Sequence, residues 1–182
     1  MDLVISVHSI AQVAGAKLVN LKTNLDLRGS FTETYRQEWF PELPPMIQSN
    51  RSDKVANCVV GLHYHLFQAD YWYVVAGRAR IVLYDLRVGS PTEKGLWSQD
   101  VSGDDSIGIY VPPGVGHGFS SLTDLTLYYQ VDSYYNPEDE LGVLWNDPDL
   151  GIDWGLVDPV ISERDSKCKL FSQLTRDELP RF

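Results

Sequence analysis

The feature that most constrains how this chain can fold is a succession of short apolar runs, rich in β-branched and aromatic residues and separated by Gly, Pro, Asn and Asp. Runs of this kind predict β-strands, and the residues between them predict turns. Helical periodicity is weak throughout the chain. The sequence therefore predicts an all-β sandwich or barrel of antiparallel strands. The predicted strands are Leu3–Val7, Lys17–Leu21, Val59–Leu62, Tyr71–Val75, Arg80–Tyr84, Ile107–Val111 and Leu125–Val131.

Helices are expected only as short peripheral pieces. The segment Thr34–Leu43 can hold a turn or two before Pro44 and Pro45. Near the end, Thr175 and Glu178 have the Thr-x-x-Glu order of a capping box, which predicts a short terminal helix. The chain has 182 residues, with no internal repeat and no low-complexity linker, so we expect a single domain spanning residues 1–182.

The charge balance narrows the choice of partners. With 15 Lys and Arg against 25 Asp and Glu, the formal net charge is −10, and no basic run is present. Binding to a nucleic-acid polymer needs clustered positive charge, so that class of partner is excluded, whereas one or two arginines can still bind a small anion.

Nothing in the sequence predicts a membrane partner. The longest apolar runs, such as Tyr71–Ala76, are far shorter than the roughly 20 residues that span a bilayer. Met1–Val4 contains an acid and no basic region ahead of an apolar stretch, so we expect a cytoplasmic protein. Cys58 and Cys168 form no CxxC pair, and we expect both to be reduced packing thiols.

Three of the four histidines lie in two short segments. His63 and His65 are two positions apart, so in a strand they project from the same face. The first segment has the spacing His63-x-His65-x(4)-Asp70-x(6)-Gly77, and the second has the spacing Pro112-x-Gly114-x(2)-His117. The two segments are about 40 residues apart in a β-rich chain.

These paired segments resemble the two motifs of the cupin superfamily, with Asp70 in place of the usual glutamate. The resemblance implies a double-stranded β-helix, which is a jelly-roll barrel, with short peripheral helices.

A longer resemblance covers roughly residues 17–166 and concerns the dTDP-4-dehydrorhamnose 3,5-epimerase family. The segments that carry it occur in the right order and near the right spacing. They are Asp26–Glu33, Gln48–Ser52, Gly61–Tyr64, Asp85–Arg87, Pro112–Phe119, Tyr134–Pro137, Leu144–Asp147 and Ile161–Asp165.

This resemblance implies an epimerase that acts on a dTDP-4-keto-6-deoxyhexose at one or both carbons beside the ketone, with no cofactor. It assigns His63 as the general base, Asp165 as the carboxylate that orients it, and Tyr129 as the acid on the opposite face of the sugar. The residue types suit the reaction, because histidine titrates near neutral pH and the developing enolate needs stabilisation.

The same resemblance implies two further groups of residues. The first lines the sugar pocket. The second contacts the nucleotide, often from the partner subunit of a homodimer. The pocket residues are Gln48, Asn50, His117 and Tyr135, and the nucleotide residues are Arg28, Phe31 and Glu33. Arg51 can assist Arg28 in binding the diphosphate.

Three pocket positions depart from the family pattern. Val60 replaces an arginine, His65 replaces a glutamine, and Asp70 replaces a lysine. Two positive charges are therefore lost, and Asp70 would raise the energy of an enolate that the lysine would have stabilised. The departures therefore predict an epimerase of altered specificity.

The departures open an alternative from another class of enzyme. His63, His65, Asp70 and His117 together have the composition of a three-histidine, one-carboxylate site for a divalent metal, which could polarise a ketone on a related sugar nucleotide. Such a metal would compete for His63, which cannot be both ligand and free base. A non-catalytic sugar-nucleotide-binding protein is the third hypothesis.

Plainer interpretations of single residues also remain open. His65 can line a pocket without a metal, Asp70 can be an ordinary turn residue, and Tyr129 can belong to the core. The tryptophans Trp72, Trp145 and Trp154 are expected to serve in packing.

Overall fold

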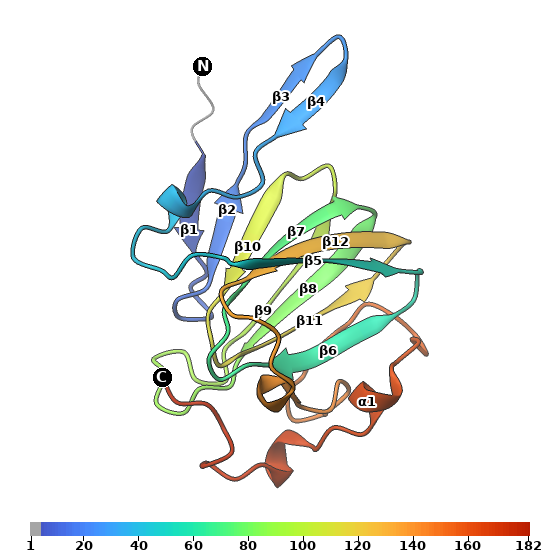
Figure 1. Cartoon of the computed structure of the whole chain (residues 1–182). Helices are drawn as coiled ribbons and strands as arrows, with labels where there is room; N and C mark the ends of the chain where they lie inside the picture. The colour runs from blue at the N-terminus through green and yellow to red at the C-terminus, as the bar shows by residue number, and fades with distance from the viewer. Residues whose placement is uncertain (1–4) are drawn as a thin grey trace.

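Two antiparallel sheets packed face to face form the body of the protein, in a computed structural model that describes residues 5–182 (Figure 1). One sheet has six strands in the order β1-β2-β10-β7-β12-β5, and the other has five in the order β13-β6-β11-β8-β9. This is the predicted all-β jelly roll. The strands are β1 (Ser6–Ser9), β2 (Lys17–Asn20), β5 (Gln48–Lys54), β6 (Val59–Tyr64), β7 (Asp70–Ala76), β8 (Arg78–Asp85), β9 (Leu96–Ser102), β10 (Ile107–Val111), β11 (Val115–Ser121), β12 (Leu125–Val131) and β13 (Leu141–Gly142).

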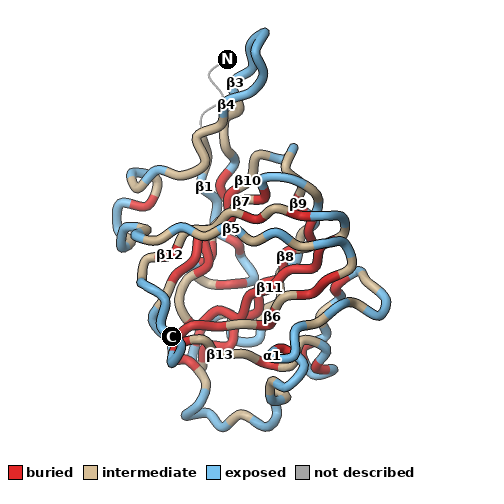
Figure 2. The backbone as a smooth tube through the Cα atoms, turned by 45° about the vertical axis from the view of Figure 1, so that its right-hand side comes forward, coloured by how far each residue is buried: buried red, intermediate tan, exposed pale blue. Residues whose placement is uncertain are grey.

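A separate two-stranded hairpin, β3 (Thr23–Asp26) and β4 (Gly29–Thr32), extends away from the sandwich (Figure 1). Figure 2 shows that this hairpin is exposed, whereas the buried residues concentrate where the two sheets face each other.

Most of the predicted strands coincide with observed ones, namely β2, β6, β7, β8, β10 and β12. The prediction at Leu3–Val7 lies partly outside the described residues, and the described part forms β1. The sequence prediction missed six of the described strands, which are β3, β4, β5, β9, β11 and β13. It missed β5 and β11 because neither has the expected apolar alternation. The sequence of β5 is Gln-Ser-Asn-Arg-Ser-Asp-Lys, and β11 is rich in glycine and serine.

The helix prediction at Thr34–Leu43 is confirmed as a single turn, whereas the prediction of a terminal helix at Thr175–Glu178 was wrong. Within Thr34–Leu43 only Gln37–Trp39 forms a single 3-10 turn. At Thr175, the backbone N–H and the hydroxyl both donate to the Glu178 carboxylate, but the chain forms only a turn. Pro180 disfavours a helical conformation at the residue before it, so the turn cannot continue as a helix.

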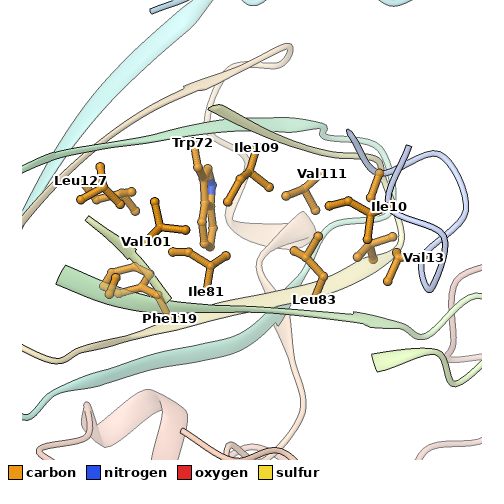
Figure 3. Packing of buried hydrophobic residues seen from close by; sticks show 14 of the residues in the cluster. Ile10, Val13, Trp72, Ile81, Leu83, Val101, Ile109, Val111, Phe119 and Leu127 are labelled. Carbon is orange, nitrogen blue, oxygen red and sulfur yellow. The ribbon is translucent and has the colours of Figure 1, made fainter. Parts of the chain in front are cut away.

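The main core lies between the two sheets. Side chains from β7, β10 and β12 meet side chains from β8 and β11, among them Trp72, Ile81, Leu83, Ile109 and Phe119 (Figure 3). A second buried cluster lies on the other face of the five-stranded sheet, where residues of the C-terminal segment, Trp154 among them, cover it.

Cys58 and Cys168 are both free thiols, and the three tryptophans pack as expected. In the described part of the chain, we find no helix with the length and apolar character needed to cross a membrane.

A buried ion pair fixes the end of β8. Asp85 is fully buried, and its carboxylate accepts hydrogen bonds from Arg87, at 2.7 and 2.8 Å, and from the hydroxyls of Ser90 and Thr92. Burial alone would raise the pKa of Asp85, but these donors outweigh it and lower the pKa, so the carboxylate is ionised at neutral pH.

Replacing Arg87 with methionine should therefore leave a buried charge without its cation. We expect the free energy of unfolding to fall by about 3–5 kcal/mol in urea denaturation. The matched control is Arg181→Met, which breaks the exposed ion pair with Asp177 and should cost less than about 1 kcal/mol. Equal losses in the two variants would contradict the role assigned to the buried pair.

Candidate active site

A cavity of about 460 Å³ opens between the two sheets beside the main core. One wall is the inner face of three neighbouring strands of the six-stranded sheet. In the strand register, Tyr129 lies between Asn50 and Trp72, and Val131 lies between Gln48 and Asp70. Each of these two sets of three residues forms a row across the three strands. Since alternate residues of a strand share a face, the side chains of both rows point into the cavity. The polar sequence of β5 is thus explained: Gln48, Asn50 and Ser52 of this strand face the cavity and not the core.

The opposite wall comes from β6 and β11. His63 and His117 are direct partners in this antiparallel pair, so their side chains are neighbours. Gly61 makes the close approach of the two strands possible, because its φ is +124° and a Cβ there would lie 2.9 Å from both Gly118 Cα and His117 O. His65 lines the same cavity just past the end of β6, as expected from its spacing to His63.

His63 is paired with Asp165, 102 residues further along the chain. His63 Nε2 donates to Asp165 Oδ1 at 2.7 Å, which leaves Nδ1 as the basic nitrogen. The short helix α1 (Glu163–Ser166) positions Asp165, and the hydroxyl of Ser162 caps it by accepting from the Asp165 N–H. Gly61 N–H donates to the second carboxylate oxygen.

The electrostatics of this pair favour a charged carboxylate behind the imidazole. Burial would raise the pKa of Asp165, but the hydrogen bond and charge of His63 and the hydrogen bonds involving Gly61 and Ser162 together outweigh it and lower the pKa. Asp165 is therefore ionised at neutral pH and stabilises a proton taken up by His63.

Tyr129 projects into the cavity from the other sheet. Burial, with smaller effects from Asp70 and Glu140, raises the pKa of Tyr129 above its ordinary value of about 10. The phenol therefore keeps its proton at neutral pH and can donate it. A base on one sheet and an acid on the other thus line one cavity.

A second polar group of the cavity consists of His65, Asp70 and His117. All three are buried, and one ligand atom from each lies within 4.8 Å of the others. His63, which the sequence grouped with them as a fourth metal ligand, is not in this cluster. Burial lowers the pKa of His117 to about 4, with Asp70 opposing the effect, so His117 is neutral at pH 7.

The residues predicted for the sugar pocket are assembled together, whereas those predicted for the nucleotide are not. Gln48, Asn50, His117 and Tyr135 all line the cavity. Arg28 and Phe31 lie instead on the β3–β4 hairpin, where the Arg28 side chain is 89% exposed and pairs with Asp26. Glu33 follows that hairpin and pairs with Arg36, and Arg51 pairs with the exposed Asp53.

Several residues of the cavity were missed by sequence reasoning. Glu140 and Arg164 lie on its edge and form an ion pair at 2.8 Å. Asp139 supports the wall behind His65, since its carboxylate accepts from the N–H groups of Leu66 and Phe67. Asp139 and Glu140 belong to the acidic run Glu138–Glu140, which follows Asn136 and Pro137. This run was the feature of the sequence that could have indicated a contribution to the site.

A family model and two named relatives match most of this chain. The family model described as dTDP-4-dehydrorhamnose 3,5-epimerase matches residues 11–173. The dTDP-4-dehydrorhamnose 3,5-epimerase of Neisseria gonorrhoeae is 36% identical over 171 residues, which are 90% of this chain and 52% of the relative, so the chain spans about half of that protein. The enzyme of the same name from Pseudomonas aeruginosa is 37% identical over 156 residues, covering 81% of this chain and 86% of the relative.

A solved structure agrees over nearly the whole chain. It is the dTDP-6-deoxy-D-glucose-3,5-epimerase of Legionella pneumophila in complex with dTDP-4-keto-L-rhamnose, with a TM-score of 0.91 and 30% identity, covering 98% of this chain and 99% of that one. The chain therefore belongs to the dTDP-4-dehydrorhamnose 3,5-epimerase family.

Proposed function

We propose that this chain epimerises a dTDP-linked 4-keto-6-deoxyhexose by removing a proton from a carbon next to the ketone and returning one to the opposite face. The observation that carries the proposal is that His63, hydrogen-bonded to Asp165 of α1, lies on one sheet and Tyr129 lies on the other, around one cavity. The named relatives, and the dTDP-sugar in the Legionella structure, support the choice of substrate.

The two walls of the cavity supply different catalytic groups, a base from one sheet and an acid from the other. His63 Nδ1 accepts the proton from the carbon, and the electron pair of the broken C–H bond passes into the enolate. Asp165 stabilises the resulting imidazolium through the hydrogen bond at Nε2. Tyr129 then gives its phenolic proton to the other face of the same carbon, and the configuration inverts. Because the two groups belong to different sheets, neither needs to move around the sugar.

Incubation of the protein with dTDP-4-keto-6-deoxyglucose in deuterium oxide tests this proposal. We expect solvent deuterium at one or both carbons beside the ketone, together with the inverted sugar, both observed by proton NMR. The control substrate is dTDP-6-deoxyglucose, which has no ketone to acidify these protons and should take up none. A keto sugar that gains no deuterium above the rate in buffer would refute the epimerase function.

We further propose a homodimer in which the β3–β4 hairpin of each protomer reaches the cavity of the other. The hairpin carries the exposed apolar side chains of Leu25, Leu27 and Phe31, with Arg28 between them. Apolar groups gathered on a projecting element are characteristic of a protein contact, and a symmetric dimer would cover both hairpins.

Sedimentation of the parent protein should accordingly give twice the chain mass of 20.6 kDa. The variant Phe31→Asp should shift the distribution towards monomer, because it places a charge within the apolar contact. A parent protein that sediments as a monomer at every accessible concentration would contradict the dimer.

The cytoplasm is the compartment we propose for this enzyme. Its support is the state of the two cysteines, Cys58 and Cys168, which are both free thiols.

A further inference from the structure

The cavity lacks an unpaired positive charge for the enolate that the proposed reaction forms. Among the described residues that line it, the one with a permanent positive charge is Arg164. Its guanidinium is already engaged with Glu140, at 2.8 Å to the carboxylate and 3.1 Å to the backbone oxygen. A negative charge that develops on the keto oxygen therefore needs stabilisation from another source.

The cluster of His65, Asp70 and His117 has the ligand types and spacing of a metal site. Two imidazoles and one carboxylate from three different strands or strand ends bring their ligand atoms within 4.8 Å of one another. A set of two histidines and one carboxylate suits divalent transition metals and leaves coordination positions open.

Both histidines are held with one particular nitrogen free. His65 Nδ1 lies 2.7 Å from the carbonyl of Asp139, and His117 Nδ1 lies 2.9 Å from the carbonyl of Val115. A carbonyl oxygen can only accept, so each Nδ1 must carry the proton and each Nε2 must present a lone pair. Within residues 5–182, no hydrogen bond engages either Nε2. Fixing the tautomer of a ligand histidine through its other nitrogen is the arrangement that metal sites use.

The carboxylate of the cluster is oriented in a comparable way. Asp70 Oδ1 accepts from the Gln68 amide at 2.9 Å, and Asp70 Oδ2 accepts from the Trp72 indole N–H at 2.9 Å. Both donors are neutral, and within residues 5–182 no lysine or arginine forms an ion pair with this buried carboxylate. A buried carboxylate without a cation is costly, and a bound metal ion would remove that cost.

We propose that His65, Asp70 and His117 bind one divalent first-row transition-metal ion, which serves as the Lewis acid of this enzyme. The role as Lewis acid rests on the epimerase function proposed above, whereas the binding itself does not. His63 stays outside the ligand set, because it is not part of the cluster and its Nδ1, with Nε2 bonded to Asp165, is the nitrogen that takes up the proton. In a four-residue site, His63 would have to be both a metal ligand and the general base. The three-residue site leaves His63 free to act as the base.

The step that the ion assists is balanced without any redox change. A bound ion would polarise the ketone as a Lewis acid. The proton of the neighbouring carbon passes to His63, and the electron pair of the broken C–H bond forms the enolate. Protonation of that carbon by Tyr129 then restores the ketone. The ion takes the place of a positively charged side chain, and its oxidation state stays the same.

Cobalt(II) is a suitable probe, because its d–d absorption reports binding directly. The protein is purified without an affinity tag, stripped with a chelator, and titrated with Co²⁺ alone. We expect one equivalent to bind with visible bands of a site containing nitrogen ligands. Asp70→Asn and His65→Gln should each weaken binding on the order of 100-fold, since each removes one of three ligands.

Two further variants locate the site. His8→Gln changes an exposed histidine of β1 and should bind Co²⁺ like the parent. His63→Gln should also retain binding, which distinguishes the three-residue site from one that includes His63. Circular dichroism on each variant confirms that it is folded.

The results separate this proposal from the epimerase function. A parent protein that binds no Co²⁺ in a stoichiometric complex overturns the metal site, and so does binding that survives both Asp70→Asn and His65→Gln. Loss of binding in His63→Gln overturns the ligand assignment. Deuterium uptake by the keto sugar in the stripped protein, at the rate of the metal-loaded protein, overturns the Lewis-acid role and leaves the epimerase function standing. Metal binding without any deuterium uptake refutes the epimerase function and with it the Lewis-acid role, and leaves the metal-binding site standing.

Discussion

Replacing His63 with glutamine is expected to lower kcat/KM for the keto sugar by about 10³-fold, within the range that a positioned general base contributes. Glutamine keeps a polar side chain of similar length beside Asp165 but has no basic nitrogen. The proton next to the ketone then has no acceptor on that face, so solvent deuterium should enter the sugar at a rate close to that in buffer. Initial rates of deuterium uptake and of product formation, both by NMR, measure the effect.

The control for this change is His8→Gln, which alters an exposed histidine distant in sequence from every residue of the cavity. It should leave both rates unchanged. If His63→Gln exchanged deuterium at the parent rate, another residue would have to be the base, and the pairing with Asp165 would be structural only.

The sequence predicts the histidine cluster well because its signal is local. A separation of two residues places His63 and His65 on one side of a strand, and the turn Pro112–Gly114 leads directly into the strand of His117. What the spacing could not reveal is that His63 pairs with Asp165 and lies outside the cluster of His65, Asp70 and His117. That arrangement depends on a contact across 102 residues and on the helical turn capped by Ser162.

The strand that completes the cavity could not be predicted from hydrophobic periodicity. In β5, the positions that face inward are Gln48, Asn50 and Ser52, which contact a cavity and not apolar side chains. Alternation of apolar and polar residues arises only where one face of a strand packs on a core. A strand that lines a polar site on one side and solvent on the other therefore has the composition of a loop. Only the family resemblance marked Gln48 and Asn50 as site residues.

The structure brings the three departures from the family pattern, at Val60, His65 and Asp70, into one cavity. All three line the cavity, and Val60 is an apolar part of the wall near His63. His65 and Asp70 lie with His117 in one buried cluster, in which each histidine is held by a backbone carbonyl. In the metal site proposed above, a cation bound from solution takes the place of the charge that the family resemblance assigns to a lysine side chain.

Replacing Tyr129 with phenylalanine should separate the two halves of the reaction. The change deletes one hydroxyl and keeps the ring that lies between Asn50 and Trp72 in the register of the sheet. His63 can still remove the proton from its own face, but no donor remains on the other face. We expect the rate of inversion to fall about 10²–10³-fold. Deuterium should still enter with retention of configuration, because His63 returns a solvent-derived proton to the face from which it took one.

The neighbouring residue supplies a matched control. Tyr128 alternates with Tyr129 along β12, so it points to the other side of the sheet and does not line the cavity. Tyr128→Phe should therefore leave inversion and exchange at the parent rates. NMR distinguishes the outcomes, since inverted and retained products differ in their ring couplings, while deuterium removes the proton signal in both. Inversion at the parent rate in Tyr129→Phe would show that the second proton comes from elsewhere, with water and the other phenol of the cavity, Tyr135, as the groups to test next.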